Sequence, residues 1–186
     1  MKPGKWRPKV KVADAAVISA SVVIVLFVVK FVELVLGVSF RHLGVLPRTL
    51  AGLPGIVLGP FLHSGWNHLT ANVVPLFVLL TLLFSNPKYK PLNTLPVIWL
   101  GSGVGTWLIG RGGAYHVGAS GINFGMAAFL IVAGWRLKSW KSAVVALAVF
   151  LLYGGIFYGV LPQSGPVSWE SHLCGALAGV LAALCL

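Results

Sequence analysis

The chain has 186 residues, of which 58% are hydrophobic and only 9% are charged. A soluble domain carries about 25% charged residues, so this chain has too few to cover a surface that faces water. We therefore expect lipid to be its solvent. The formal net charge of +11 could suggest a nucleic-acid partner. The distribution of the charge argues against one, because the basic residues crowd the N-terminus or lie between apolar runs.

Six apolar segments are each long enough, or nearly so, to cross ~30 Å of hydrocarbon as a helix. They cover residues 13–37, 66–84, 93–110, 119–136, 141–161 and 170–186. No segment shows the alternating pattern that a membrane β-barrel requires. The predicted fold is therefore all-α, a polytopic membrane protein with a bundle of six transmembrane helices in residues 13–186.

The first segment follows a basic tail, residues 1–12, and contains two charged residues of its own. The apolar stretch from Val10 to Val38 is too long for the h-region of a secretory signal, which has about 7–15 residues. We interpret it as a retained membrane anchor. Lys30 and Glu33 are three residues apart within it, so they can pair on one face of the helix.

The connection between the first two segments, residues 38–65, is long but lacks a water-soluble composition, so we expect it at the membrane interface. With a cytoplasmic N-terminus, ten basic residues of the tail and loops lie inside and three lie outside. The ten are Lys2, Lys5, Arg7, Lys9, Lys11, Lys88, Lys90, Arg136, Lys138 and Lys141; the three are Arg41, Arg48 and Arg111. This bias predicts a multi-pass protein of the cell membrane, of bacterial plasma-membrane type, with both termini in the cytoplasm.

The start of the fourth segment contains a serine between two glycines, Gly118-Ala119-Ser120-Gly121. Glycines leave room for a substrate backbone to approach the Ser120 hydroxyl. The N-terminus of a helix also offers unpaired N–H groups to an oxyanion. The pattern fits a nucleophile, but by itself it also fits a serine that only packs membrane helices.

His172 precedes Gly175 and Gly179 at i+3 and i+7, on one face of the sixth segment. Small residues there let this segment pack closely against the fourth, where Gly121 begins a similar spacing. His172 would then reach Ser120, as a general base requires. A buried structural histidine is the alternative interpretation.

His68 and Asn72 share one face of the second segment. In the expected topology the second, fourth and sixth segments all run inward, so these two residues, Ser120 and His172 lie at one depth near the outer surface. The side chains of His68 and Asn72 can each donate a hydrogen bond to an oxyanion, an effect of roughly 3–4 kcal/mol per donor. We predict that His68, Asn72 and Gly118 stabilise the transition state; an interhelical hydrogen bond is the alternative role for Asn72.

No carboxylate is available as the third member of a catalytic triad. Asp14 and Glu33 belong to the first segment, and Glu170 precedes His172 by two residues, so on a helix its side chain points about 200° away. We therefore predict a Ser-His dyad whose imidazole is held by packing.

The remaining histidines and the two cysteines do not form a metal-ligand pattern, and we expect no metal and no other cofactor. His63 either holds the loop that precedes the second segment or enters a water-filled pocket. His116 is expected to support its loop. Cys174 and Cys185 are 11 residues apart on one predicted helix, about 16 Å, which is too far for a disulfide.

Together these residues resemble the rhomboid family of intramembrane serine proteases. The resemblance covers roughly residues 15–186 and rests on three motifs: His63-x4-His68-x3-Asn72, Gly118-Ala119-Ser120-Gly121 and His172-x2-Gly175-x3-Gly179. It implies a six-helix core, Ser120 as nucleophile, His172 as base, and an oxyanion hole formed by His68, Asn72 and the Ser120 N–H. It also implies cleavage of a single transmembrane helix near its outer end.

Two positions depart from the pattern of many family members. Phe124 stands four residues after Ser120, where many members have a tyrosine; it keeps a ring face that can stack on the base. Residues 38–65 contain no tryptophan, whereas many members carry a Trp-Arg pair in this loop. The predicted supporting residues are His63, Gly121, Phe124, Gly175 and Gly179.

The sequence therefore predicts a serine endopeptidase that cleaves single-pass membrane proteins within the bilayer. One alternative is a catalytically silent rhomboid-like protein that binds and escorts membrane clients. A small transporter or channel is a second alternative, but its polar residues should line a path through the whole membrane. Here they cluster in the outer half. The oligomeric state is left open.

Overall fold

The computed structural model describes residues 11–153, 158–163, 165 and 167–186, and its regular elements in these residues are helices. They are α1 (Val12–Leu36), α2 (Gly55–Leu58), α3 (Trp66–Phe84), α4 (Pro91–Ile109), α5 (Ser120–Arg136), α6 (Trp140–Tyr153) and α7 (Trp169–Leu184). The all-α prediction is confirmed. Five of the six expected segments agree with α1, α3, α4, α5 and α7 to within two residues at each end. Residues 1–10 of the expected basic tail lie outside the described residues.

Three of the described helices are long and apolar enough to cross a membrane. Their mean hydropathies are 2.7 for α1, 1.6 for α3 and 1.2 for α4. Helices α6 and α7 are shorter apolar helices, and α5 has 17 residues. Large apolar side chains of α1, among them Val17 and Phe31, are more than half exposed, as expected for a surface in contact with lipid. The membrane character is therefore supported, and the count of six crossings stays a prediction.

The fifth expected segment, 141–161, differs most from the structure. Helix α6 covers Trp140–Tyr153, and residues 158–160 form a 3₁₀ turn instead of further α-helix. Residues 154–157 of the expected segment lie outside the described residues. An unbroken run of apolar residues marks what lipid or a core can bury, but it does not mark where a helix ends.

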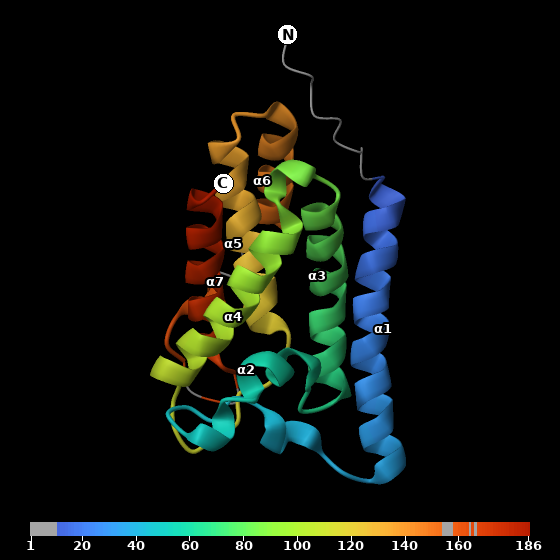
Figure 1. The fold of residues 1–186 in the computed structure, drawn as a ribbon, viewed down its shortest axis with the longest axis vertical. Coiled ribbons are helices and arrows are strands. Elements are labelled where there is room, and N and C mark those ends of the chain that lie inside the picture. The colour runs from blue at the N-terminus through green and yellow to red at the C-terminus, as the bar shows by residue number, and fades with distance from the viewer. Residues whose placement is uncertain (1–10, 154–157, 164, 166) are drawn as a thin grey trace.

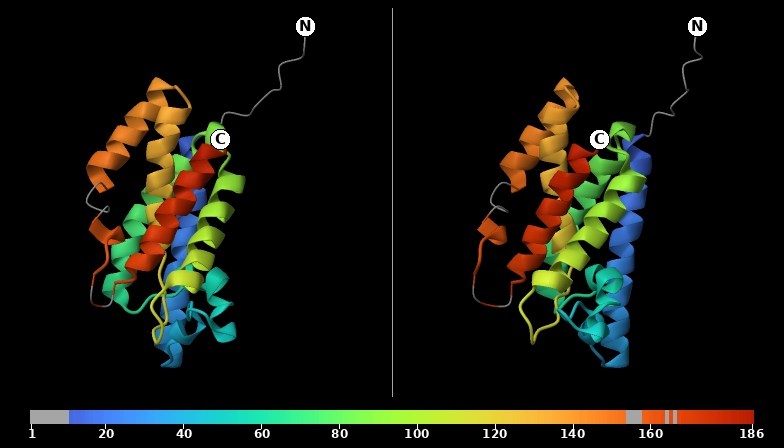
Figure 2. Two further views of the ribbon diagram at one scale, coloured as in Figure 1. Left: turned by 90° about the vertical axis from the view of Figure 1, so that its left-hand side faces the viewer. Right: turned by 60° about the vertical axis from the view of Figure 1, so that its left-hand side comes forward.

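The helices form one bundle, in which α3, α5 and α7 run in the same direction and α1 runs in the opposite direction (Figure 1). Helices α3, α5 and α7 all begin at the lower end, while α1 begins and α7 ends at the upper end. Helix α5 packs against α7, α6, α3 and α4, whereas α1 packs mainly on α3. Figure 2 shows α6, α5, α7 and α4 following one another across the bundle. Ser120 and His172, which lie in the first turns of α5 and α7, are therefore at the same end.

Helices α5 and α7 touch through their backbones. A Cβ atom added to Gly175 would lie 2.0 Å from the carbonyl oxygen of Gly121, and one added to Gly179 would lie 1.9 Å from that of Gly125. No side chain larger than hydrogen fits at such distances. The predicted close packing through small residues is confirmed.

Residues 38–65 fold into short elements at the lower end of the bundle. These are 3₁₀ helices at Phe40–Leu43, Leu50–Gly52 and Gly59–Phe61, together with α2. The Lys30–Glu33 ion pair, 2.8 Å, fixes this segment to α1. Lys30 also donates to the carbonyl of His63 (3.1 Å), and Glu33 accepts from the Phe40 N–H (2.6 Å). The predicted pair is thus present, and it ties both ends of the loop.

Candidate active site

The Ser120 hydroxyl and the His172 ring lie within hydrogen-bonding distance. Nε2 of His172 is 2.9 Å from Oγ of Ser120. The two residues come from different helices, and the backbone contact between α5 and α7 brings them together. This is the arrangement that an activated serine nucleophile requires.

Two groups orient the His172 ring. The ring of Phe124 stacks on it, with centroids 4.0 Å apart and planes inclined by 11°. Its Nδ1 is 3.0 Å from the carbonyl oxygen of Gly159. Because a carbonyl can only accept, Nδ1 carries the proton, and the lone pair of Nε2 faces Ser120. Phe124 keeps the expected stacking face, whereas the carbonyl of Gly159 was missed, because a backbone acceptor leaves no mark in the sequence.

None of the three carboxylates is hydrogen-bonded or ion-paired to the imidazole in the described part of the chain. Glu170 accepts from the N–H of Arg111 (3.2 Å) and forms an ion pair with its guanidinium (3.5 Å). Glu33 is paired with Lys30, and Asp14 lies in the first turn of α1. The geometry agrees with the expectation that Glu170 points away from His172.

A cavity of about 600 Å³ is lined by Ser120 together with His68, Asn72 and His172. Nδ1 of His68 is 3.1 Å from Oγ of Ser64, which leaves Nε2 for another partner. The Asn72 amide donates one hydrogen to the carbonyl of His68 (2.8 Å). Its second amide hydrogen remains available to a group bound in the cavity.

Gly118 shapes the site through its conformation and its size. Its φ of +114° is one that other residues rarely adopt. A Cβ at this position would lie 2.7 Å from Cε1 of His68. The Gly118 N–H donates to the carbonyl of Gly59 (2.9 Å), so it is already in use. We therefore assign Gly118 to making room for His68, and not to donating to an oxyanion.

Asn123 is a site residue that the sequence reasoning missed. It is buried on α5 and donates from Nδ2 to the backbone carbonyl of Asn72 (3.1 Å) and to its Oδ1 (3.4 Å). This contact directs the Asn72 oxygen toward α5 and its NH₂ group the other way. The available signal was an amide inside an apolar helix, three residues after Ser120.

His63 lies behind the site and holds the loop. It is buried, does not line the cavity, and its Nε2 accepts from the N–H of Ala119 at 3.5 Å. Burial and the nearby charge of His68 lower the pKa of His63 to about 4. A neutral ring can accept this hydrogen bond, whereas a protonated ring cannot. Of the two roles considered, the loop-holding one fits the geometry.

His116 supports its loop, as expected. Its backbone forms a two-way bridge with Val45 (2.8 and 3.0 Å), and its ring nitrogens bond Ser168 and the carbonyl of Arg111. These contacts join the loop before α5, the segment 38–65 and the residues that precede α7. His116 thereby fixes the starts of α5 and α7 relative to each other.

A small polar cluster, also missed from the sequence, joins α4 to the first turn of α7. Oγ of Ser102 donates to the carbonyl of Ser171 (3.2 Å), and Thr106 is hydrogen-bonded to the Ser171 hydroxyl (2.8 Å). A Cβ on Gly121 would lie 2.3 Å from the Ser102 oxygen. Ser171 precedes His172, so these bonds hold the residue next to the imidazole.

The described residues contain no group of three or more His, Cys, Asp or Glu side chains that could hold a metal ion. Cys174 and Cys185 are both free thiols.

The rhomboid domain model matches residues 51–186 of the chain. The uncharacterized protein Rv1337 of Mycobacterium tuberculosis is 40% identical over 172 residues, 88% of this chain and 72% of the relative. The uncharacterized protein ML1171 of Mycobacterium leprae is 36% identical over 87% of this chain and 67% of the relative. Rhomboid-like protein 11, chloroplastic, of Arabidopsis thaliana is 31% identical over 67% and 49%. No solved structure matches this chain.

Proposed function

Because this chain belongs to the rhomboid family, we propose that it is an intramembrane serine endopeptidase with Ser120 as nucleophile and His172 as general base. The observation that carries the proposal is the distance of 2.9 Å between Oγ of Ser120 and Nε2 of His172. The lone pair of Nε2 faces the hydroxyl because Nδ1 donates to Gly159. Both groups line one cavity of about 600 Å³.

Catalysis would proceed through an acyl-enzyme. His172 takes the hydroxyl proton as Oγ of Ser120 bonds to the scissile carbonyl carbon, and the carbonyl oxygen becomes an oxyanion. The imidazolium then gives the proton to the leaving nitrogen as the C–N bond breaks. Water, deprotonated by His172, attacks the ester and releases the carboxylate with free Ser120.

The oxyanion would be stabilised by Nε2 of His68, the second amide hydrogen of Asn72 and the N–H of Ser120 at the start of α5. Both side chains line the cavity beside the nucleophile, which supports this assignment. Removing a single such donor typically costs a factor of about 10²–10³ in kcat. Asn123 would act indirectly, by holding Asn72.

Hydrolysis at membrane depth needs a water supply, and the lining of the cavity supports one. Besides the site residues, the polar side chains of Arg41, Ser64 and Arg111 line it. A single-pass transmembrane segment would enter from the side and unwind, because a helix hides its peptide bonds in i to i−4 hydrogen bonds. Glycine, proline or serine in that segment would make the unwinding easier.

In this proposal the protein lies in the cell membrane with six crossings and both termini in the cytoplasm. Two observations support it. The start of α1 and the end of α7 lie at the same end of the bundle, as an even number of crossings requires (Figure 1). The positive-inside bias then assigns that end to the cytoplasm and the Ser120 end to the outside.

The test compares the wild type with Ser120→Ala, and uses Ser21→Ala as the matched control, since Ser21 is an exposed serine of α1 that bonds only its own helix. In liposomes with single-span reporter proteins, we expect cleavage and fluorophosphonate labelling by the wild type and Ser21→Ala. Ser120→Ala should lose both while its thermal unfolding is unchanged. A wild-type protein that binds reporters without cleavage or labelling would instead support an escort function.

A further inference from the structure

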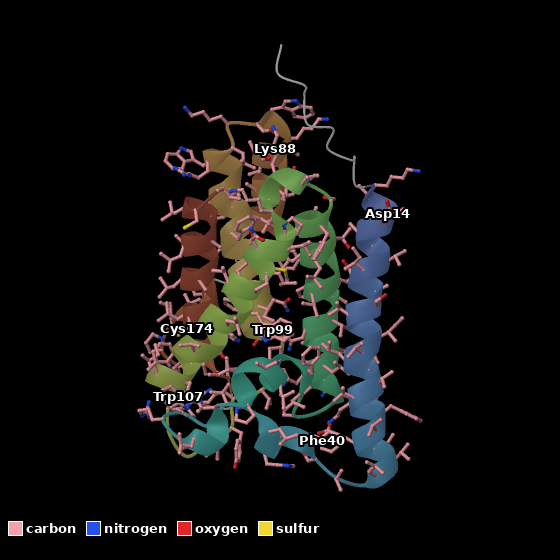
Figure 3. The ribbon with its side chains drawn as sticks, in the orientation of Figure 1. Asp14, Phe40, Lys88, Trp99, Trp107 and Cys174 are labelled. Carbon is pink, nitrogen blue, oxygen red and sulfur yellow. The ribbon has the colours of Figure 1, made fainter. Side chains whose placement is uncertain are left out.

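A second polar cavity, of about 330 Å³, lies at the end of the bundle opposite Ser120. It is lined by residues of the α3–α4 connection, the α5–α6 connection and the first turns of α6. The residues that matter for its chemistry are Lys88, Tyr89, Lys141 and Ser142. Figure 3 shows Lys88 at the end where α1 begins, with Phe40 at the other end. None of these residues belongs to the site described above.

Two buried hydroxyls of this cavity have no hydrogen-bond partner in the described part of the chain. They belong to Tyr89 and Ser142, and both side chains are 1% exposed. The Tyr89 ring is fixed by an edge-on contact with Phe129, with centroids 5.7 Å apart. Buried hydroxyls are nearly always paired, so two unpaired ones on residues that border a single cavity point to an acceptor that binds beside them.

The charge around the cavity is positive. Lys88 and Lys141 are exposed, and neither takes part in an ion pair among the described residues. The chain has only three acidic residues, of which Glu33 and Glu170 are already paired elsewhere. The first turn of α6, which contains Lys141 and Ser142, also brings the positive end of a helix dipole to the cavity.

These groups select a compact anion with several acceptor oxygens. Two lysines, two residues with unpaired hydroxyls and a helix N-terminus border the cavity, and they offer donors and positive charge to a bound group. A phosphate accepts from all of them at once, and lysine is a common phosphate ligand. A volume of 330 Å³ is far above the roughly 30 Å³ of one water molecule, so a phosphate with an attached glycerol fits.

We propose that this cavity binds a phosphate group, supplied either by the headgroup of an anionic phospholipid or by free phosphate. Basic pockets between transmembrane helices on the cytoplasmic side bind anionic headgroups in this way. The site requires neither Ser120 nor His172, so it stands or falls independently of the proteolytic activity. Its ligand would fix the α3–α4 connection to the start of α6.

The test measures lipid binding to the detergent-solubilised full chain by native mass spectrometry, with phosphatidylglycerol and phosphatidylcholine as probes. The variant Lys88→Gln/Lys141→Gln removes both cations of the cavity. Lys90→Gln/Lys138→Gln removes the same charge from neighbouring lysines that do not line it. We expect phosphatidylglycerol affinity to fall about tenfold or more in the first variant and by less than about twofold in the second.

Tyr89→Phe tests the hydroxyl and guards against a folding artefact. Because this hydroxyl has no partner in the described chain, the variant should melt no lower than the wild type without ligand, yet bind the anion several-fold more weakly.

Inorganic phosphate distinguishes the two sources. If it stabilises the wild type but not Lys88→Gln/Lys141→Gln, and phosphatidylglycerol adds nothing, the ligand is free phosphate. Equal losses in both double variants, or unchanged binding in Lys88→Gln/Lys141→Gln and Tyr89→Phe, would overturn the proposal.

Discussion

Two helix pairs of the bundle pack in different ways, and only one of them carries the candidate site. Helices α5 and α7 meet backbone to backbone, so that a Cβ on Gly175 would lie 2.0 Å from the carbonyl oxygen of Gly121. Helices α1 and α3 meet through side chains, with the Thr81 hydroxyl 3.0 Å from that of Ser19. The first contact has no room to adjust, whereas side chains in the second can rotate.

The difference matches the role that the proposed function gives to each pair. A nucleophile and its base must stay within about 3 Å of each other, and a misplacement of about 1 Å can cost a factor of 10² in rate. Helix α1 contributes neither Ser120 nor His172, and it exposes much of its apolar surface. Changes at the α5–α7 contact should therefore reduce cleavage first, and changes at the α1–α3 contact should affect stability alone.

The largest effect is expected from Gly175→Val. The new side chain would push α7 away from α5, because its Cβ alone would overlap the Gly121 carbonyl. We expect cleavage of a reporter to fall at least about a hundredfold and the free energy of unfolding to fall by roughly 1–3 kcal/mol. Ala176→Val, at the next and only partly buried position, is the control and should retain activity. Normal cleavage by Gly175→Val would remove the basis of the comparison.

Asn123→Leu should have the next largest effect. It removes the donor that orients the Asn72 amide, and we expect kcat/KM to fall about tenfold or more, measured with the same reporter. Asn93→Leu, an exposed amide on α4, is the matched control. If Asn123 acts through Asn72, the double variant Asn72→Leu/Asn123→Leu will be no slower than Asn72→Leu alone. Additive losses would show that Asn123 acts by another route.

Gly159→Ala tests the two contacts that orient the His172 imidazole, the Gly159 carbonyl and the stacked Phe124 ring. The added Cβ would lie 2.6 Å from Cζ of Phe124 and 3.3 Å from Nδ1 of His172, so the stacked rings have to shift. Because ring tips can move by a few tenths of an ångström, we expect a loss in kcat of about threefold to tenfold with little change in KM. Gly112→Ala is the matched control and should keep its activity, because that glycine also lacks a positive φ and a Cβ there would meet only the Arg48 guanidinium, at 3.5 Å.

Much of the bundle and the core of the candidate site could be predicted from the sequence, for a physical reason. Polar residues at membrane depth are costly, so Ser120 and His172 stand out against an apolar background. Glycines at helical spacing mark a close helix contact, which explains why the α5–α7 packing was foreseen. Hydropathy also located most helices, because lipid selects long apolar runs.

Other features could not be predicted, because they depend on contacts between distant parts of the chain. The carbonyl of Gly159 carries no sequence signal, although it fixes the tautomer of His172. Asn123 is recognisable as part of the site only once the packing of α3 on α5 is known. Gly118 was predicted to stabilise the transition state, but in the fold its N–H donates to the carbonyl of Gly59.

His63 connects the two regions, and its titration should affect stability more than activity. Its carbonyl accepts from Lys30 on α1, and its ring accepts from Ala119 next to Ser120. Its pKa is about 4 in the folded protein, against an ordinary histidine value of 6.5. Between these two values the unfolded chain takes up a proton that the folded chain does not, so stability should fall as pH drops from ~6.5 to ~4. The full loss is about 3 kcal/mol.

His63→Gln isolates this contribution, because the glutamine oxygen can still accept from Ala119 but does not titrate. We expect the free energy of unfolding of the variant, measured in detergent across this range, to depend less steeply on pH than that of the wild type. Other histidines titrate in both proteins and cancel in the difference. Identical pH profiles would mean that His63 is not held neutral by the fold.

The smallest effect is expected from Thr81→Val, which tests the side-chain contact between α1 and α3. The change keeps the shape of Thr81 and removes its hydroxyl, which shares one proton between Ser19 on α1 (3.0 Å) and the carbonyl of Phe77 on its own helix (2.7 Å). The Ser19 hydroxyl still donates to the carbonyl of Ala15 (2.9 Å). Interhelical hydrogen bonds in membranes contribute about 0.6 kcal/mol on average, so the loss of stability should stay below ~1 kcal/mol with kcat/KM unchanged. A several-fold loss of cleavage at normal stability would show that α1 also positions the site, and the contrast between the two helix pairs would no longer hold.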